Sequence, residues 1–346
     1  MQQEGICICD SCLMSANSRN GRVTVSVGAQ VFDLVSTACR SQQSASTTTM
    51  TTILEDPRIS PANPFLEDFL PLLTTHLDAA KVSSLLNTVN DSLRPWTALW
   101  NLWDAFFTVV VHSSTQTQHL AFISDVRAHP PTKPKSKGAP RHLGSSLGAD
   151  GQLHWSDLPG FGTQWNDAHG VLEARRDWDR SIRGPGKESP LTTYATLYLR
   201  YCGFSASLLK TMGRPGGVHP IRVFYEARNT LERDVPLDND RGEGRLRPRD
   251  VWDLDVLVAA TWIRDGARRL WDVDAQALRL HWGTTLDFAT DLWPKTDGLT
   301  LERWRLWLKQ LRSLEGTEEL GENTKRVLSQ AVQELGDLLG PDVCKV

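Results

Sequence analysis

The densest group of charged residues on a helix with a predicted apolar face lies between positions 253 and 272. Six of its members are candidates for a binding pocket: Asp253, Asp255, Arg264, Asp265, Arg268 and Asp272. Asp265 stands four positions before Arg269, the spacing of an ion pair within one helix, and Arg268 stands four before Asp272. Such pairs are typical of a solvated face. Arginine also binds carboxylate and phosphate groups through two parallel hydrogen bonds, so an anion-binding pocket is the second interpretation.

Metal-binding patterns are incomplete in this sequence. Cys7, Cys9 and Cys12 follow a C-x-C-x-x-C spacing, but a structural zinc site needs four ligands, and Cys39 is the sole further cysteine of this region. His112 and His119 share a helical spacing without a third ligand near them. We therefore expect reduced thiols, no metal and no cofactor.

Motifs of known enzyme classes occur without the structural context that they require. Gly144–Gly148 matches G-x-S-x-G, but no strand precedes it. The acidic run Asp238–Glu243 lacks the second motif that a magnesium-diphosphate site needs, and Gly213–Gly217 lacks the lysine of a phosphate loop. Asp167 and His169 hint at a base with an orienting acid, but nearness in sequence alone does not make a catalytic pair. We assign no catalytic residue.

The elements that would position these residues are helices. Apolar residues recur with a period near 3.6 in most of the chain, and the sequence predicts helices over or within the ranges 95–110, 120–126, 191–211, 221–231, 250–263, 300–311 and 327–339. Pro95 suits a first helical position, whereas Asp250 and Thr300 are predicted to cap helix starts, and Gly340 to end the last helix. The expected fold class is all-α, either a multi-helical bundle or an α-solenoid-like array of antiparallel helix pairs.

Composition shifts divide the chain into four parts. Residues 1–52 end in a Ser/Thr/Gln stretch and are expected to be disordered or loosely attached. A basic Pro/Gly/Ser connector at 128–151 separates an N-terminal helical part, 53–127, from a C-terminal one, 152–342. We expect 53–342 to form one domain.

Charge and hydropathy exclude several classes of protein. The 38 Lys and Arg against 41 Asp and Glu give a net charge of −3, so no nucleic-acid partner is expected. No apolar run approaches the roughly 18 residues of a membrane span, and no secretory signal is visible. We expect a cytoplasmic protein, with the nucleus as the alternative. Thirteen tryptophans beside four tyrosines are the most unusual feature of the composition.

Tryptophan-bearing segments provide a resemblance to a known family. They occur in the order Pro95–Trp100, Trp155–Gly162, Ala259–Gly266 and Arg303–Trp307. From about Leu93 to Gly340 the chain resembles a family of filamentous-fungal proteins catalogued as a domain of unknown function. The resemblance implies a soluble, all-helical protein and provides no catalytic residues to transfer. The chain departs from the family at Tyr194–Tyr198, where relatives carry an Asn-rich aromatic motif.

Two functions compete at this point. The first is a non-catalytic helical scaffold or interaction protein that binds a protein or peptide partner in a groove. The alternative is a specialised-metabolism enzyme, of cyclase or transferase type, with a small-molecule ligand in a Trp- and Arg-lined pocket. A closed, Trp-lined cavity with Arg264 or Asp265 pointing inward would favour the enzyme. A solid core with an exposed groove would favour the scaffold.

Overall fold

The structure is a computed structural model that describes residues 63–135, 146–177, 194–213, 218–237 and 245–340. These residues form eleven α-helices and two 3₁₀ helices, together with one isolated β-bridge. In chain order the helices are α1 (Leu66–Phe69), η2 (Leu70–Leu73), α2 (Ala79–Asp91), α3 (Pro95–His112), α4 (Thr117–Ala128), η3 (Trp155–Asp157), α5 (Phe161–Arg175), α6 (Tyr194–Met212), α7 (Ile221–Leu231), α8 (Pro248–Trp271), α9 (Ala275–Leu286), α10 (Leu301–Glu315) and α11 (Glu322–Leu339). The predicted all-α class is confirmed.

Local capping chemistry accounts for most of the predicted helix boundaries. Pro95 occupies the first position of α3, where its missing N–H costs no hydrogen bond. Thr300 caps α10, and its hydroxyl accepts a hydrogen bond from the backbone N–H of Arg303 at 3.4 Å. Gly340 follows the last residue of α11 with a φ of 82°. These three boundaries agree with the sequence prediction.

The predicted start of α8 is wrong. Arg247 is the residue before the helix, and Pro248 takes the first position, as proline commonly does. Asp250 lies inside the first turn, where its carboxylate favours the positive end of the helix dipole and pairs with Arg247 at 2.9 Å. An acidic residue is favourable at either place, so its type alone does not locate the cap.

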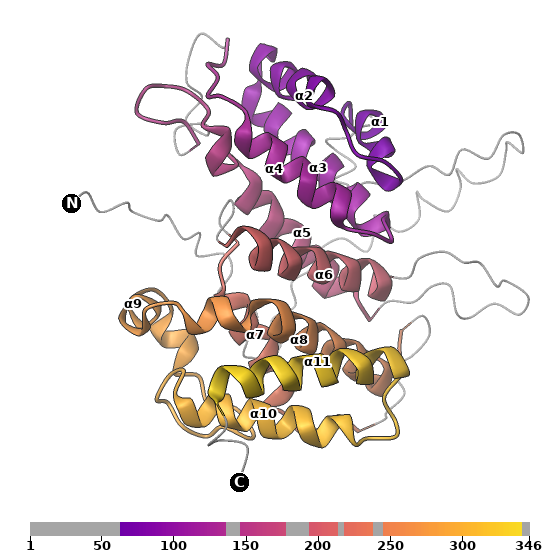
Figure 1. The fold of residues 1–346 in the computed structure, drawn as a ribbon, viewed down its shortest axis with the longest axis vertical. Helices are drawn as coiled ribbons and strands as arrows, with labels where there is room; N and C mark the ends of the chain where they lie inside the picture. Colours follow the sequence, from indigo (N-terminus) through magenta and orange to yellow (C-terminus); the bar gives the residue numbers. More distant parts are fainter. Residues whose placement is uncertain (1–62, 136–145, 178–193, 214–217, 238–244, 341–346) are drawn as a thin grey trace, which may run out of the picture. The chain divides into compact units, whose positions relative to one another are not determined.

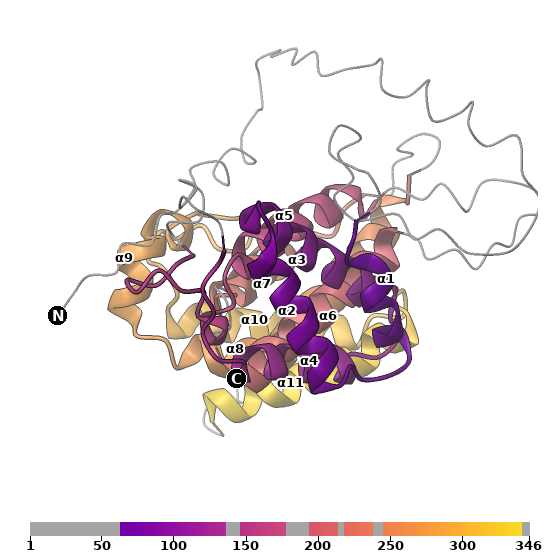
Figure 2. The same ribbon diagram turned by 90° about the horizontal axis from the view of Figure 1, so that it is seen from above.

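The long helix α8 is the centre of the helix packing. It packs against α6, α7 and α11, which fits a multi-helical bundle. In Figure 1, α5 and α6 lie between α1–α4 and α7–α11, and both views place α9 at an edge (Figures 1 and 2). Gly266 permits the close approach, because a Cβ there would lie 2.7 Å from Cγ2 of Val223 on α7 and 3.1 Å from Cδ2 of Leu209 on α6.

Tryptophans fill much of the core between the helices. Those buried to below 2% exposure are Trp103, Trp155, Trp165, Trp262 and Trp307. Trp103 donates its ring N–H to the carbonyl of Pro159 at 2.7 Å, and Trp155 donates to the hydroxyl of Thr132 at 2.7 Å. The second bond and the β-bridge between Thr132 and Leu153 join the two ends of the predicted connector to each other. Trp252, Trp293 and Trp304 are also buried, so eight of the thirteen tryptophans lie in the packed interior and most of the excess is structural.

A fully buried ion pair joins the end of α7 to α10. Glu232, the residue after α7, accepts hydrogen bonds from Nε of Arg303 at 2.7 Å and from Nη2 at 2.8 Å. Both side chains have 0% exposure. Trp307 and Thr290 donate to the two carboxylate oxygens at 2.7 and 2.9 Å.

The guanidinium of Arg303 also reaches the end of α9 and the loop that precedes α10. Its Nη1 donates to the carbonyl of Leu286 at 2.6 Å and to that of Gly298 at 3.0 Å. The central guanidinium carbon of Arg303, Cζ, lies 4.7 Å from the ring centre of Phe224. The buried charges are thus paired and hydrogen-bonded, which their burial requires.

We predict that Arg303→Met lowers the free energy of unfolding by about 3–5 kcal/mol, because it leaves the Glu232 carboxylate buried without a counter-charge. The double variant Glu232→Gln/Arg303→Met should lose less than the sum of the single variants. Urea unfolding followed by circular dichroism measures both effects.

The control is Arg279→Met, which removes the exposed pair with Asp287 and should change stability by no more than about 1 kcal/mol. An equal loss in Arg279→Met and Arg303→Met would contradict the role of the buried pair.

Candidate functional site

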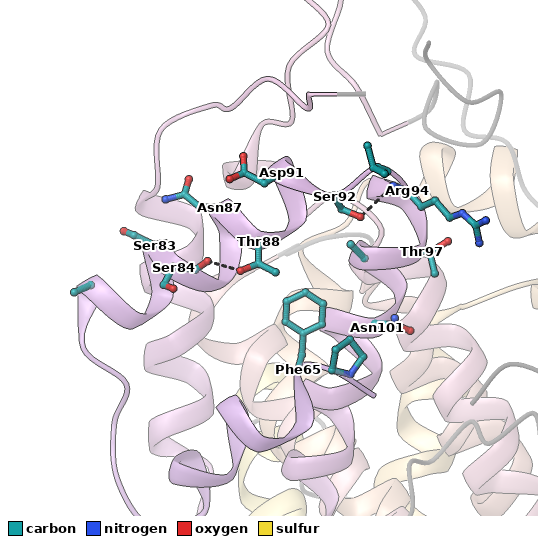
Figure 3. A pocket seen from close by; sticks show the side chains of 14 residues that line it. Phe65, Ser83, Ser84, Asn87, Thr88, Asp91, Ser92, Arg94, Thr97 and Asn101 are labelled. Carbon is teal, nitrogen blue, oxygen red and sulfur yellow. Dashed lines mark hydrogen bonds between the residues drawn. The ribbon is translucent and has the colours of Figure 1, made fainter. Parts of the chain in front are cut away.

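A surface hollow with a volume of about 1020 Å³ lies between α2 and α3. Figure 3 shows hydroxyl and amide side chains of α2, among them Asn87 and Thr88, on one side, with Thr97 and Asn101 of α3 on the other. The ring of Phe65 lies between these two helices. The lining includes no histidine, cysteine or tryptophan. Its charged lining residues are Asp91, which pairs with Lys135 at 2.7 Å, and Arg94, so the hollow offers mainly hydrogen-bonding groups.

Hydrogen bonds fix the floor of this hollow in place. Asn63 donates to the carbonyl of Asn101 at 2.8 Å and to the carboxylate of Asp104 at 2.9 Å. Its own side-chain oxygen accepts from the backbone N–H of Phe65 at 3.0 Å. The segment that carries Phe65 is thus held against α3. At the rim, Leu93 has 91% of its surface exposed.

The second hollow has a volume of about 640 Å³ and contains two of the six candidates from the sequence, Arg264 and Asp265. Lys210 of α6 and Arg326 of α11 also line it. Asp265 accepts a hydrogen bond from Nζ of Lys210 at 2.9 Å and pairs with Arg264, whose Nη1 reaches Oε1 of Gln330 at 3.4 Å. Burial opposes ionisation of Asp265, but these two cationic partners outweigh it and hold its pKa below the ordinary value.

The other four candidates lie apart from this hollow. Asp255 makes a two-pronged ion pair with Arg176 of α5, at 2.8 and 3.0 Å. Asp253 accepts from the backbone N–H of Gly321 at 3.4 Å. Arg268 and Asp272 are exposed on the surface of α8 and in the residue after it.

The expected pairing of Asp265 with Arg269 is replaced by contacts between helices. Arg269 donates to the backbone carbonyl of Lys210 at 2.9 Å, while the side chain of Lys210 turns to Asp265. Helix spacing alone could not indicate this exchange, because Lys210 lies 55 positions before Asp265.

A buried group of titratable side chains joins the three helices α5, α6 and α7. His169 of α5 lies with its Nε2 3.4 Å from the Glu226 carboxylate of α7 and its Nδ1 3.5 Å from that of Glu173. Tyr198 and Cys202 of α6 are buried beside it. Burial, with the charge of a nearby arginine, lowers the pKa of His169 to about 3, and burial raises the pKa of Glu226.

These groups have the types of an acid–base site but lie outside both hollows. His169 is 1% exposed and Glu226 is 7% exposed. The sequence pointed to His169 through its neighbour Asp167, yet the structure pairs the ring with Glu226 and Glu173 instead. The arrangement keeps a neutral imidazole buried inside the helix packing.

Metal-ligand groupings are absent from the described part of the chain, where no three His, Cys, Asp or Glu side chains are placed to hold an ion. His119 is buried against the rings of Phe106 and Phe204, and His112 is less buried, at the end of α3. Cys202 is a free, buried thiol.

Several predicted features lie outside the described residues. They are the tail 1–52 with its four cysteines, Gly144 and Ser145 of the G-x-S-x-G match, positions 214–217 of the Gly213–Gly217 stretch, and residues 238–243 of the acidic run.

Comparison with known proteins links the chain to one family model. Residues 103–311 match the model described as a protein of unknown function (DUF3632). No curated protein and no solved structure matches the chain. The matched span runs from within α3 to within α10, so it includes α6 and α8 but neither α2 nor α11.

We predict that the folded protein loses stability as the pH falls below about 6.5. Burial lowers the pKa of His119 to about 4 and that of His169 to about 3, so the unfolded chain binds protons that the folded chain does not. Each histidine contributes a slope of up to about 1.4 kcal/mol per pH unit, with stability rising as pH rises.

His119→Leu should remove one of these slopes and gain relative stability between pH 6 and pH 4.5. Urea unfolding at pH 7.5, 6.0 and 5.0 measures the slope, with His281→Leu on the exposed face of α9 as the control. A slope that His119→Leu leaves at its wild-type value would contradict the prediction.

Proposed function

Because the chain belongs to the DUF3632 family of proteins of unknown function, we propose its function from its geometry: it is a non-catalytic interaction protein that binds an extended peptide segment of a protein partner between α2 and α3. The carrying observation is that the hollow between α2 and α3 is lined mainly by neutral side chains, several of them hydrogen-bonding, with Asp91 and Arg94 as its charged members, whereas His169 and Glu226 lie buried elsewhere. The lining residues all precede position 103, so the proposal concerns this chain and not its whole family.

The lining chemistry fits a peptide backbone. An extended peptide carries an N–H donor and a C=O acceptor at each residue, and these need partners when water is removed. The side chains of Asn87 and Asn101 both donate and accept, and the hydroxyl groups of Thr88 and Thr97 do the same. The exposed Leu93 at the rim supplies an apolar contact for a partner side chain.

The enzyme alternative has less support from the geometry. It requires tryptophans around a cavity, but neither hollow has a tryptophan in its lining, and five tryptophans are packed inside the core. Arg264 and Asp265 line an open surface hollow rather than a closed cavity. We therefore favour the binding function.

The expected location remains cytoplasmic, with the nucleus as the alternative, and we still expect no nucleic-acid partner. Among the described helices, none has the length and apolarity to cross a bilayer.

We predict that selection from a random dodecapeptide display library on the full chain enriches peptides whose binding depends on this hollow. Thr97→Arg should weaken such peptides at least tenfold, because the longer side chain occupies their site. Asn87→Ala should weaken them several-fold through lost hydrogen bonds, each worth about 0.5–1.5 kcal/mol.

Ser313→Arg, which adds the same side chain to the exposed face of α10, is the matched control and should leave binding unchanged. Fluorescence anisotropy with labelled peptides gives the dissociation constants, and circular dichroism confirms that each variant is folded. Enriched peptides that bind wild type and Thr97→Arg equally well would overturn the proposal, as would the absence of enrichment.

A further inference from the structure

The second hollow brings together cations from three helices that are distant in sequence. Lys210 comes from α6, Arg264 from α8 and Arg326 from α11. Arg326 is exposed on the surface, Lys210 keeps 59% of its side chain exposed, and Arg264 keeps 28%. Their convergence on one depression in a chain of net charge −3 is a local concentration of positive charge.

The charge balance of this hollow is positive. Among its lining residues Asp265 is the one carboxylate, so three cations leave an excess of two positive charges. The remaining polar lining, Ser207, Thr211 and Gln330, carries no charge.

Asp265 orients the cations rather than neutralising the whole hollow. The carboxylate is 5% exposed, and its Oδ1 accepts from Lys210 while its Oδ2 accepts from Arg264. Both carboxylate oxygens are thus engaged from within the protein. An arginine has five N–H donors, so Arg264 retains donors for a ligand beyond its bonds to Asp265 and Gln330. The buried carboxylate therefore acts as a positioning residue for two cations at the surface.

We propose that this hollow binds a dianionic phosphate group, as carried by a phosphate monoester. Two negative charges match the excess of two positive charges, and guanidinium groups bind phosphate oxygens through paired hydrogen bonds. A carboxylate would compensate only one of the two charges. The site uses other helices than the hollow between α2 and α3, so it stands or falls independently of the proposed peptide-binding function.

The test measures binding of phenyl phosphate to the full chain by isothermal titration calorimetry, at constant ionic strength. We expect saturable binding with one site per chain, and binding of benzoate at least tenfold weaker. Arg326→Gln should weaken phenyl phosphate at least tenfold, and Arg326→Glu should abolish binding, because it cancels the excess charge. Arg326 is exposed, so both variants should fold.

The matched control is Arg305→Gln, which removes an exposed arginine from α10 and should retain wild-type affinity. Lys210→Gln and Arg264→Gln should also weaken binding, and urea unfolding shows whether the loss of an Asp265 partner affects the fold. Titration with inorganic phosphate tests the free anion as the source. Sedimentation with phosphatidylcholine vesicles, with and without phosphatidic acid, tests a lipid headgroup.

Binding of any of these phosphates that depends on Arg326 supports the proposal, and the arm that binds identifies the source. The proposal fails if no phosphate binds saturably, if Arg326→Glu binds like wild type, or if benzoate binds as tightly as phenyl phosphate.

Discussion

The buried pair of Glu232 and Arg303 is the constraint on which the C-terminal half of the structure depends. Two charges without solvent contact are tolerable only if each has a complete set of partners, and here those partners come from α10, the end of α9 and the loop between them. The pair thereby fixes where α7 ends and how α10 lies beside it. Trp307, which donates to the same carboxylate, couples this polar centre to the apolar core.

The requirement that buried polar groups have partners also determines which side chains a ligand could contact. The buried tryptophans contribute to a densely packed interior, and the close contact at Gly266 brings α6 and α7 near α8. His169 and Glu226 are placed inside this packing, where burial favours their neutral forms. Among the described residues, the two surface hollows offer a ligand hydroxyls and amides beside Asp91 and Arg94 in one, and three cations around Asp265 in the other.

The sequence predicts those helices whose buried face is marked by a regular spacing of apolar residues. Helices α3, α7 and α11 bury regular apolar stripes and were predictable. Helix α5 was missed because two of its six buried positions are polar, Gln164 and His169, and these interrupt the apolar pattern. Helix α9 buries Leu278 and Leu286 but exposes Leu280, so it has no clear apolar face.

For the candidate sites, too, the sequence indicates residues that are close together in the chain but not residues that only the helix packing brings together. Arg264 and Asp265 were predictable as a polar pair on a buried helix, but Lys210 and Arg326 join them through the packing of α6 and α11 on α8. The net charge does not predict the hollow around Asp265 either. An overall charge of −3 is a sum over the whole chain, whereas a bound anion responds to charges within about a Debye length. A slightly acidic protein can therefore present a locally basic site, provided that its helices bring the cations together.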